Sequence, residues 1–230
     1  MSTIAENIAK VRERIREAAQ ASQRDSQSVG LLAVSKTKPA AAVREAYAAG
    51  QRDFGENYLQ EALAKQAELS DLDLVWHFIG PIQSNKTKLI AEHFHWVHSV
   101  DRLKIAQRLS EQRPAHLPPL NICLQVNVSG EASKSGCTPE ELPALAQAVT
   151  QLPGLRLRGL MTIPEPSDDP QAQRAPLARL RQLRDGLHAN LDTLSMGMSQ
   201  DLEAAIAEGA TWVRIGTALF GARDYGSPSL

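Results

Sequence analysis

The chain has 230 residues, of which 43% are hydrophobic and 22% are charged, and its formal net charge at pH 7 is -1. This near-neutral balance argues against electrostatic capture of nucleic acid or of an anionic membrane. No apolar run reaches the roughly 20 residues that a membrane helix needs, and the N-terminal segment has the pattern of an amphipathic helix and not of a signal peptide. We therefore expect a cytoplasmic protein, and we expect it to be a monomer.

The first predicted element is a helix close to the N-terminus. Thr3 and Glu6 have the spacing of a capping box, in which each side chain accepts a hydrogen bond from the other residue's backbone N–H. An apolar stripe follows at helical spacing: Ile4, Ile8, Val11 and Ile15.

Strands and helices then alternate with short connections. The predicted strands cover residues 31–35, 53–56, 75–79, 96–100, 122–128, 155–163, 193–196 and 212–215. The helices between them cover residues 40–49, 58–69, 85–92, 102–112, 139–152, 171–189 and 200–208. Because parallel strands need a crossover, and a helix is the usual crossover, this alternation predicts parallel pairing.

Eight such units predict an α/β protein with a single closed (β/α)8 TIM barrel, preceded by one extra helix. A doubly wound open sheet has the same local pattern, but it normally carries GxGxxG after its first strand, where this chain reads SKTKPA. No linker rich in proline, glycine and serine divides the chain, so we expect one domain over residues 1–230.

A lysine stands at the end of the first predicted strand, in the stretch LLAVSKTKP. Barrel enzymes build their active sites from the loops at the C-terminal ends of the strands. Lys36 therefore has two interpretations: it extends into water as an ordinary surface charge, or it is an amine that reacts with a carbonyl.

The loops after strands seven and eight have features of an anion site. Gly197 and Ser199 follow the seventh strand, and Ser199 is predicted to cap the next helix. Gly216, Thr217 and Gly221 follow the eighth. Barrels often bind phosphate at these two loops, so together they predict a phosphate site.

A phosphate site facing a strand-end lysine is the arrangement that pyridoxal 5'-phosphate (PLP) needs, since the amine binds its aldehyde and the loops hold its phosphate. Arg214, on the eighth strand, has two interpretations. It donates a hydrogen bond to the pyridine nitrogen from the same mouth, or it is an ion-paired residue of the barrel wall.

Seven segments carry a family resemblance: LLAVSKTKP, FGENYLQE, WHFIGPIQSNK, LQVNVSGEASKSG, RLRGLMTIP, LSMGMSQDLEAAI and VRIGTALFGARDY. In this order they resemble the pyridoxal phosphate homeostasis protein family of the YggS/PROSC type, over residues 4–225. That family is similar to the N-terminal barrel of alanine racemase. The resemblance thus implies a cytoplasmic, single-domain barrel that binds PLP.

Carried over to this chain, the resemblance implies that Lys36 forms the aldimine with PLP and that Arg214 faces the pyridine nitrogen. It further implies that Asn57 lines the cofactor pocket. The implied phosphate contacts are Ser199, Gly216 and Thr217. The implied role is intracellular PLP homeostasis by buffering and delivery, with PLP-dependent apo-enzymes as recipients.

An arginine at the pyridine nitrogen donates a hydrogen bond without leaving a full positive charge on the ring, which weakens PLP as an electron sink. The family comparison implies that alanine racemase takes a second base, a tyrosine, from a C-terminal β domain of the other subunit. Since this chain ends at Leu230, we expect no such domain and no amino-acid turnover. Two enzymatic alternatives remain: a PLP-dependent racemase or lyase, and a cofactor-free lysine aldolase acting on a phosphorylated sugar.

Several other residues have both an ordinary and a functional interpretation. Lys38 and Lys134 are either solvated loop charges, which we favour, or transient amines in PLP transfer. His77, expected near the barrel mouth, is either a structural hydrogen-bonded residue or a pocket residue. Tyr58 packs either in the core or beside the cofactor ring.

Three histidines lie close together at positions 93, 95 and 98, in the segment EHFHWVH. No cysteine or carboxylate set completes a metal site around them, so we interpret them as a structural cluster at the end of the barrel far from the mouth. Cys123 and Cys137 have neither CxxC spacing nor zinc-finger neighbours, which indicates ordinary thiols.

Overall fold

The computed structural model describes residues 1–132 and 135–222. Eight parallel strands pair in chain order into a closed barrel, because β1 (Gly30–Val34) also pairs with β8 (Trp212–Ile215). The strands between them are β2 (Asp53–Glu56), β3 (Val75–Phe78), β4 (Trp96–Val100), β5 (Leu120–Gln125), β6 (Leu155–Met161) and β7 (Thr193–Ser195). The predicted (β/α)8 barrel is confirmed.

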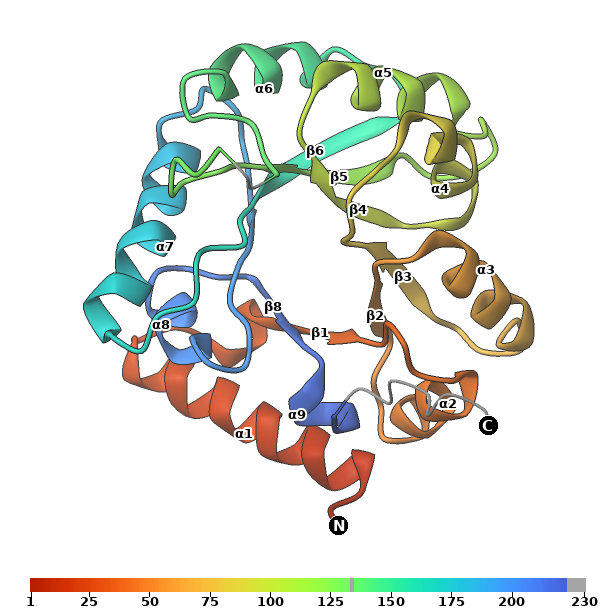
Figure 1. Ribbon diagram of the computed structural model, residues 1–230, viewed down its shortest axis with the longest axis vertical. Coiled ribbons are helices and arrows are strands. Elements are labelled where there is room, and N and C mark those ends of the chain that lie inside the picture. The colour runs from red at the N-terminus through yellow and green to blue at the C-terminus, as the bar shows by residue number, and fades with distance from the viewer. Residues whose placement is uncertain (133–134, 223–230) are drawn as a thin grey trace.

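Helices surround the barrel and cover the outer faces of the strands (Figure 1). Their bounds are α2 (Ala40–Ala48), α3 (Leu59–Glu68), α4 (Thr87–His93), α5 (Leu103–Gln112), α6 (Leu142–Thr150), α7 (Pro170–Asp185) and α8 (Leu202–Ala207). Short 3-10 turns occupy Ser26–Ser28 and Ser84–Lys86. Within the described residues no helix is long and apolar enough to cross a membrane.

The extra N-terminal helix is α1 (Ile4–Ala21). Its capping residue is Thr3, whose hydroxyl accepts a hydrogen bond from the backbone N–H of Glu6 at 3.1 Å. Ile8, Val11 and Ile15 are buried, as the apolar stripe predicts, and Figure 1 shows α1 running alongside α8 and a final helical turn, α9 (Thr217–Phe220). The sequence pattern did not predict α9.

Large side chains fill the N-terminal end of the barrel interior. The rings of Trp96 and Trp212, each from the first residue of its strand, meet edge to face with centroids 5.9 Å apart. A Cβ atom on Gly30 would lie 2.4 Å from the Trp212 ring, so only glycine fits opposite it. This plug leaves the open space of the barrel at the other end, where the strands finish.

Several predicted boundaries are wrong by two to four residues, mainly where an element meets a loop of the barrel mouth. β5 and β6 end at Gln125 and Met161, where the predictions were residues 128 and 163. Likewise α6 begins at Leu142 and α8 at Leu202, later than predicted, and α7 ends at Asp185, earlier than predicted. α8 begins late because the loop after β7 is tied by the Met198–Asp201 hydrogen bond and lines the pocket. The end of α7, by contrast, leads into the start of β7, away from the barrel mouth.

Candidate functional site

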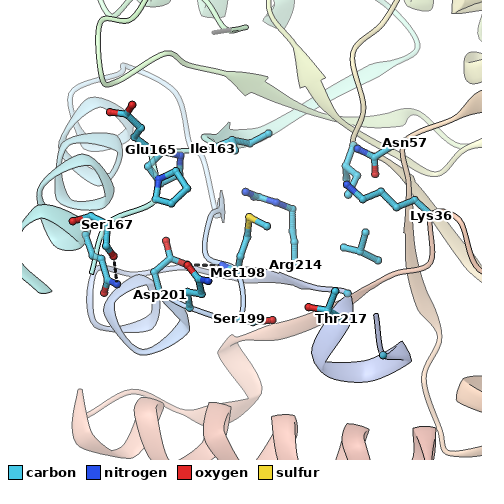
Figure 2. A pocket seen from close by; sticks show the side chains of 18 of the residues that line it. Lys36, Asn57, Ile163, Glu165, Ser167, Met198, Ser199, Asp201, Arg214 and Thr217 are labelled. Carbon is cyan, nitrogen blue, oxygen red and sulfur yellow. Dashed lines mark hydrogen bonds between the residues drawn. The ribbon is translucent and has the colours of Figure 1, made fainter. Parts of the chain in front are cut away.

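A cavity of about 440 Å³ opens at the C-terminal ends of the strands. Six residues expected to contact a cofactor line it, namely Lys36, Asn57, Ser199, Arg214, Gly216 and Thr217. They follow or end four different strands, β1, β2, β7 and β8, which are neighbours in the closed barrel. Figure 2 shows Lys36 and Asn57 on the right, Ser199 and Thr217 in the lower part of the view, and the Arg214 side chain near the centre.

The loop that carries Lys36 is held on both sides of the lysine. The ammonium group of Lys65, on α3, donates to the carbonyl oxygen of Ser35 at 2.6 Å. The backbone N–H of Thr37 donates to the carboxylate of Glu61 at 2.6 Å. Thr37 has a φ of 65°, a strained conformation for a β-branched residue, which indicates that the surrounding contacts impose the shape of this loop.

A buried ion pair lies beneath the same loop. Lys65 Nζ contacts Glu56 Oε1 at 2.6 Å and Glu61 Oε1 at 2.8 Å, and the Ser35 hydroxyl donates to Glu56 Oε1 at 2.8 Å. Burial raises the pKa of the Glu56 carboxyl, and the charge of Lys65 opposes that shift. Sequence reasoning missed this cluster, because Glu61 and Lys65 at i,i+4 on a helix are typical of a solvent-exposed pair.

Asn57 carries a buried side-chain oxygen, Oδ1, that has no hydrogen-bond partner within the described residues. Its backbone is fixed by close packing against the loop after β3, since a Cβ on Gly80 would lie 2.4 Å from the Asn57 carbonyl oxygen. A buried acceptor without a partner costs free energy, and this one lies at the pocket wall, where a donor on a ligand would satisfy it.

The loops after β7 and β8 form the base of the pocket, but one detail of the prediction is wrong. Ser199 does not cap α8, which begins at Leu202 with Asp201 as its N-cap residue. The Asp201 carboxylate instead accepts from the backbone N–H of Met198 at 2.6 Å and ties the loop into a tight turn. This turn leaves Ser199 lining the cavity.

The N-terminal helix supports both of these loops. Asn7 donates to the carbonyl oxygen of Leu219 in α9 at 2.8 Å. Arg14 donates to the carbonyl oxygen of Ser199 at 2.9 Å and pairs with Glu203 of α8 at 2.9 Å. The extra helix is therefore part of the scaffold of the pocket base, a role that its amphipathic pattern did not predict.

The fold requires glycine at position 197 but not at position 216. Gly197 has a φ of 103°, and a Cβ there would lie 2.5 Å from the Cβ of Ala205, so the fold itself requires glycine. Gly216 has a negative φ of -116°, and a Cβ would meet Val34 at no less than 3.5 Å. The protein's own packing does not require glycine at 216, which leaves a cradle at the pocket wall that a Cβ would fill.

Arg214 is 4% exposed and donates to the hydroxyl of Ser195 at 2.8 Å and to the carbonyl oxygen of Thr162 at 2.9 Å. No ion pair with it is found among the described residues, so it is not the ion-paired wall residue of the alternative interpretation. Burial lowers the pKa of its guanidinium to about 10, at which it still carries its charge at neutral pH.

The remaining candidates have different surroundings. Lys38 lines the pocket, and its ammonium group donates to the carbonyl oxygen of Ala222 at 2.6 Å, while Lys134 falls outside the described residues. Tyr58 is 51% exposed just before α3, so it is not a core residue, and it is not among the residues that line the pocket. Cys123 and Cys137 are buried free thiols whose pKa burial raises to about 12, which keeps them protonated.

The three histidines of the segment EHFHWVH do not form one cluster at the far end of the barrel, so that prediction is wrong. His98 is fully buried inside the barrel, hydrogen-bonded to His77, and is not part of a cluster at the far end. His77 is buried as well and does not line the pocket. His95 accepts from the backbone N–H of Trp76 at 2.9 Å. Among the described residues no group of three metal-ligating side chains is found.

Sequence reasoning also missed the far wall of the cavity, which comes from the loops after β6 and β7. Ile163, Glu165, Ser167, Met198 and Asp201 line it, and Figure 2 shows them opposite Lys36. Barrel topology predicts that the loops after the strands line the mouth. The sequence around these five residues contains no motif that would identify them individually as pocket residues.

Comparison with known proteins gives a consistent result. A family model described as the N-terminal domain of alanine racemase matches residues 3–224. The pyridoxal phosphate homeostasis protein of Pseudomonas aeruginosa is 81% identical over 229 residues, which cover 100% of both chains. That of Escherichia coli is 55% identical over 231 residues, covering 98% of this chain and 99% of the other.

Among solved structures, PipY of Synechococcus elongatus PCC7942 with PLP bound is 45% identical, with a TM-score of 0.84. The match covers 95% of this chain and 100% of PipY. The chain therefore belongs to the pyridoxal phosphate homeostasis protein family, built on the barrel of the alanine racemase N-terminal domain.

Proposed function

We propose that this chain binds PLP in the strand-end pocket with Lys36 as the attachment point, and that it serves intracellular PLP homeostasis by holding and handing on PLP without turning over amino acids. The observation that carries the proposal is the convergence of the six predicted residues, from four strand ends, on one cavity. The PLP-bound structure of PipY and the names of the relatives support the choice of cofactor.

The residues present fit PLP, which offers an aldehyde, a phenolic hydroxyl, a pyridine nitrogen and a phosphate. The side-chain amide of Asn57 lines the pocket with its Oδ1 unpartnered, and its NH₂ group is a donor that suits the phenolic oxygen, which is ionised at neutral pH. Arg214 uses two of its five N–H groups on Ser195 and Thr162, so it retains donors for the pyridine nitrogen. The cradle at Gly216 leaves room for the ligand against the backbone.

The base of the pocket would hold the phosphate. The hydroxyls of Ser199 and Thr217 are donors from two adjacent loops, and hydrogen bonds to an ionised oxygen are stronger than neutral ones. α1 fixes these loops through Asn7 and Arg14, so the donors are oriented before any ligand arrives. Such preorganisation lowers the entropy that binding has to overcome.

When bound, PLP supplies an aldehyde that condenses reversibly with a primary amine and releases water. Lys36 brings that amine into the cavity from a loop whose backbone Lys65 and Glu61 hold in place. A fixed loop with a flexible side chain suits reversible attachment, since the amine returns to one position after each release.

Arg214 supports a holding role over a catalytic one. A guanidinium is a donor that does not give up its proton at neutral pH, so it contributes a hydrogen bond and leaves less positive charge on a pyridine ring than a protonated ring nitrogen would carry. Chemistry that depends on a strong electron sink is then poorly supported.

We further propose that residues 1–230 act as one PLP-binding domain and that the protein is a monomer. Light scattering measures the molar mass in solution and so tests the second point.

The first experiment asks whether PLP is bound and where. The purified protein is loaded with PLP, reduced with borohydride and digested, and the modified peptide is identified by mass spectrometry. We expect the label on Lys36 and its loss in Lys36→Ala, with Lys88→Ala, an exposed lysine of α4, as the matched control. A colourless protein that reacts with a phosphorylated keto sugar would instead support the aldolase.

The second experiment separates the carrier from an enzyme. Loaded protein is mixed with a PLP-depleted transaminase, and recovered activity is followed beside a racemase and lyase assay on a panel of L-amino acids. We expect recovery faster than free release explains and no turnover near 1 s⁻¹, a rate at the low end of ordinary enzymes. Turnover at about that rate or above would replace the carrier by a racemase or lyase.

A further inference from the structure

A continuous row of polar side chains crosses the barrel interior beneath the pocket. Asp53 Oδ1 lies 2.9 Å from His77 Nε2, and His77 Nδ1 lies 2.9 Å from His98 Nε2. His98 Nδ1 lies 2.7 Å from the Ser195 hydroxyl, which lies 2.8 Å from Arg214 Nη1. Five residues from five strands thus connect the N-terminal end of the barrel to the cofactor pocket.

The chemistry at the two ends fixes the direction of every hydrogen bond in the row. A guanidinium only donates, so Arg214 donates to Ser195, and a carboxylate only accepts, so Asp53 accepts from His77. A neutral imidazole carries one N–H, and His77 therefore has its proton on Nε2 and accepts at Nδ1. His98 must then donate from Nε2 to His77 and accept at Nδ1 from the hydroxyl of Ser195.

Burial supports the neutral state of both rings. Desolvation lowers the pKa of His77 and lowers that of His98 well below the ordinary value of 6.5, and the charge of Arg214 acts on His98 in the same direction. Trp96 stacks on the His77 ring with centroids 5.4 Å apart, and Trp212 meets it edge to face at 4.9 Å. This packing shields the His77 ring from water, while the Asp53 side chain at the end of the row is 28% exposed.

We propose that His77, His98 and Ser195 form a relay of fixed polarity, with both imidazoles as Nε2–H tautomers, that positions the guanidinium of Arg214 at the pocket. They are positioning residues, since they act on a ligand only through Arg214. The Ser195 hydroxyl has one hydrogen, which it donates in the hydrogen bond to His98 Nδ1. A lone pair of the Ser195 oxygen is therefore left to accept from Arg214. A tautomer change at either ring would aim two donors or two acceptors at each other.

The hydrogen bonds of the relay form within this chain and do not depend on PLP. The effect of the relay on the pyridine ring of bound PLP rests on the proposed function. The test therefore begins without PLP. Two-bond nitrogen–proton correlation spectra of the ¹⁵N-labelled protein report the tautomer of each ring, and assignments come from His77→Gln and His98→Gln. We expect unprotonated Nδ1 and protonated Nε2 in both rings. Either ring found as the Nδ1–H tautomer, or as an imidazolium at neutral pH, overturns the relay.

The second part cuts the link between His98 and Arg214. In Ser195→Ala we expect a changed His98 Nδ1 shift, a more mobile Arg214 guanidinium in side-chain ¹⁵N spectra, and PLP affinity weaker by about tenfold. Ser195→Thr keeps the hydroxyl and should restore all three readouts. If the mobility of the Arg214 guanidinium is unchanged in Ser195→Ala, the positioning role is overturned, wherever PLP binds. The histidine tautomers and the arginine mobility can be measured even if the protein never binds PLP, so failure of the proposed function is distinguishable from failure of this proposal.

Discussion

Lys65 donates a hydrogen bond to the backbone carbonyl oxygen of Ser35 at 2.6 Å, so a buried cation holds the residue that directly precedes Lys36. The same ammonium group neutralises the buried carboxylate of Glu56. One lysine of α3 therefore fixes the loop of another lysine, although the two stand 29 positions apart in the sequence.

Lys65→Met should destabilise the protein by about 3–5 kcal/mol, because it leaves the Glu56 carboxylate buried without its counter-charge. The double variant Glu56→Leu/Lys65→Met should recover much of that loss, since an apolar pair replaces the ion pair. Urea unfolding measures both, with Lys88→Met on the surface of α4 as the control. A double variant no more stable than Lys65→Met would contradict this account.

Arg14→Met should loosen the Ser199 loop and weaken PLP binding several-fold, while stability changes by less than about 1 kcal/mol because the ion pair with Glu203 is largely exposed. Fluorescence titration with PLP and thermal unfolding give the two values. Arg16→Met is the matched control, since Arg16 pairs with Glu13 on the same helix. Equal PLP affinity in both variants would show that α1 does not support the pocket base.

Ser199→Ala combined with Thr217→Val removes two hydroxyl donors from the proposed phosphate site. A hydrogen bond to a charged group contributes about 1.5–3 kcal/mol, so each lost bond should weaken PLP binding by roughly 10- to 100-fold. Equilibrium dialysis measures retained PLP, with Thr150→Val at the outer end of α6 as the control. Retention equal to that of the parent protein would place the phosphate elsewhere.

Asn57→Ala should weaken PLP binding and leave the ligand-free protein about as stable as before. The reason is that Oδ1 has no partner to lose within the described residues, and its removal ends the cost of an unsatisfied buried acceptor. Thermal unfolding with and without PLP separates the two effects. A large loss of stability in the ligand-free variant would mean that Asn57 is a structural residue instead.

Stability should fall as the pH drops below 6.5. Burial depresses the pKa of His77, His95 and His98 in the folded state, so below 6.5 the unfolded chain binds more protons than the folded one. Their contribution is present above 6.5 and is lost as the pH falls toward the folded-state pKa values. Melting curves from pH 7.5 to 5 should show a shallower fall in His98→Gln than in His116→Gln, which alters an exposed histidine.

The sequence alone predicted the barrel and one side of its mouth, but not the far wall that the loops after β6 and β7 supply. Alternating strand and helix periods determine parallel pairing, and eight units close the sheet, so the order of strand ends around the mouth follows from chain order. Lys36, Arg214 and Thr217 could be placed together for that reason, because each stands at or just after a strand end.

Only the tertiary structure determined which polar groups are satisfied inside the barrel. His77 and His98 are 21 positions apart, and His98 and Ser195 are 97 apart, and no local pattern relates them. Which strand residues point inward, and how far each reaches, depends on strand tilt and register across the closed sheet. The buried pair of Glu56 and Lys65 is similar: the sequence determines that α3 follows β2, whereas the packing of α3 on the barrel determines that the lysine is buried and not solvated.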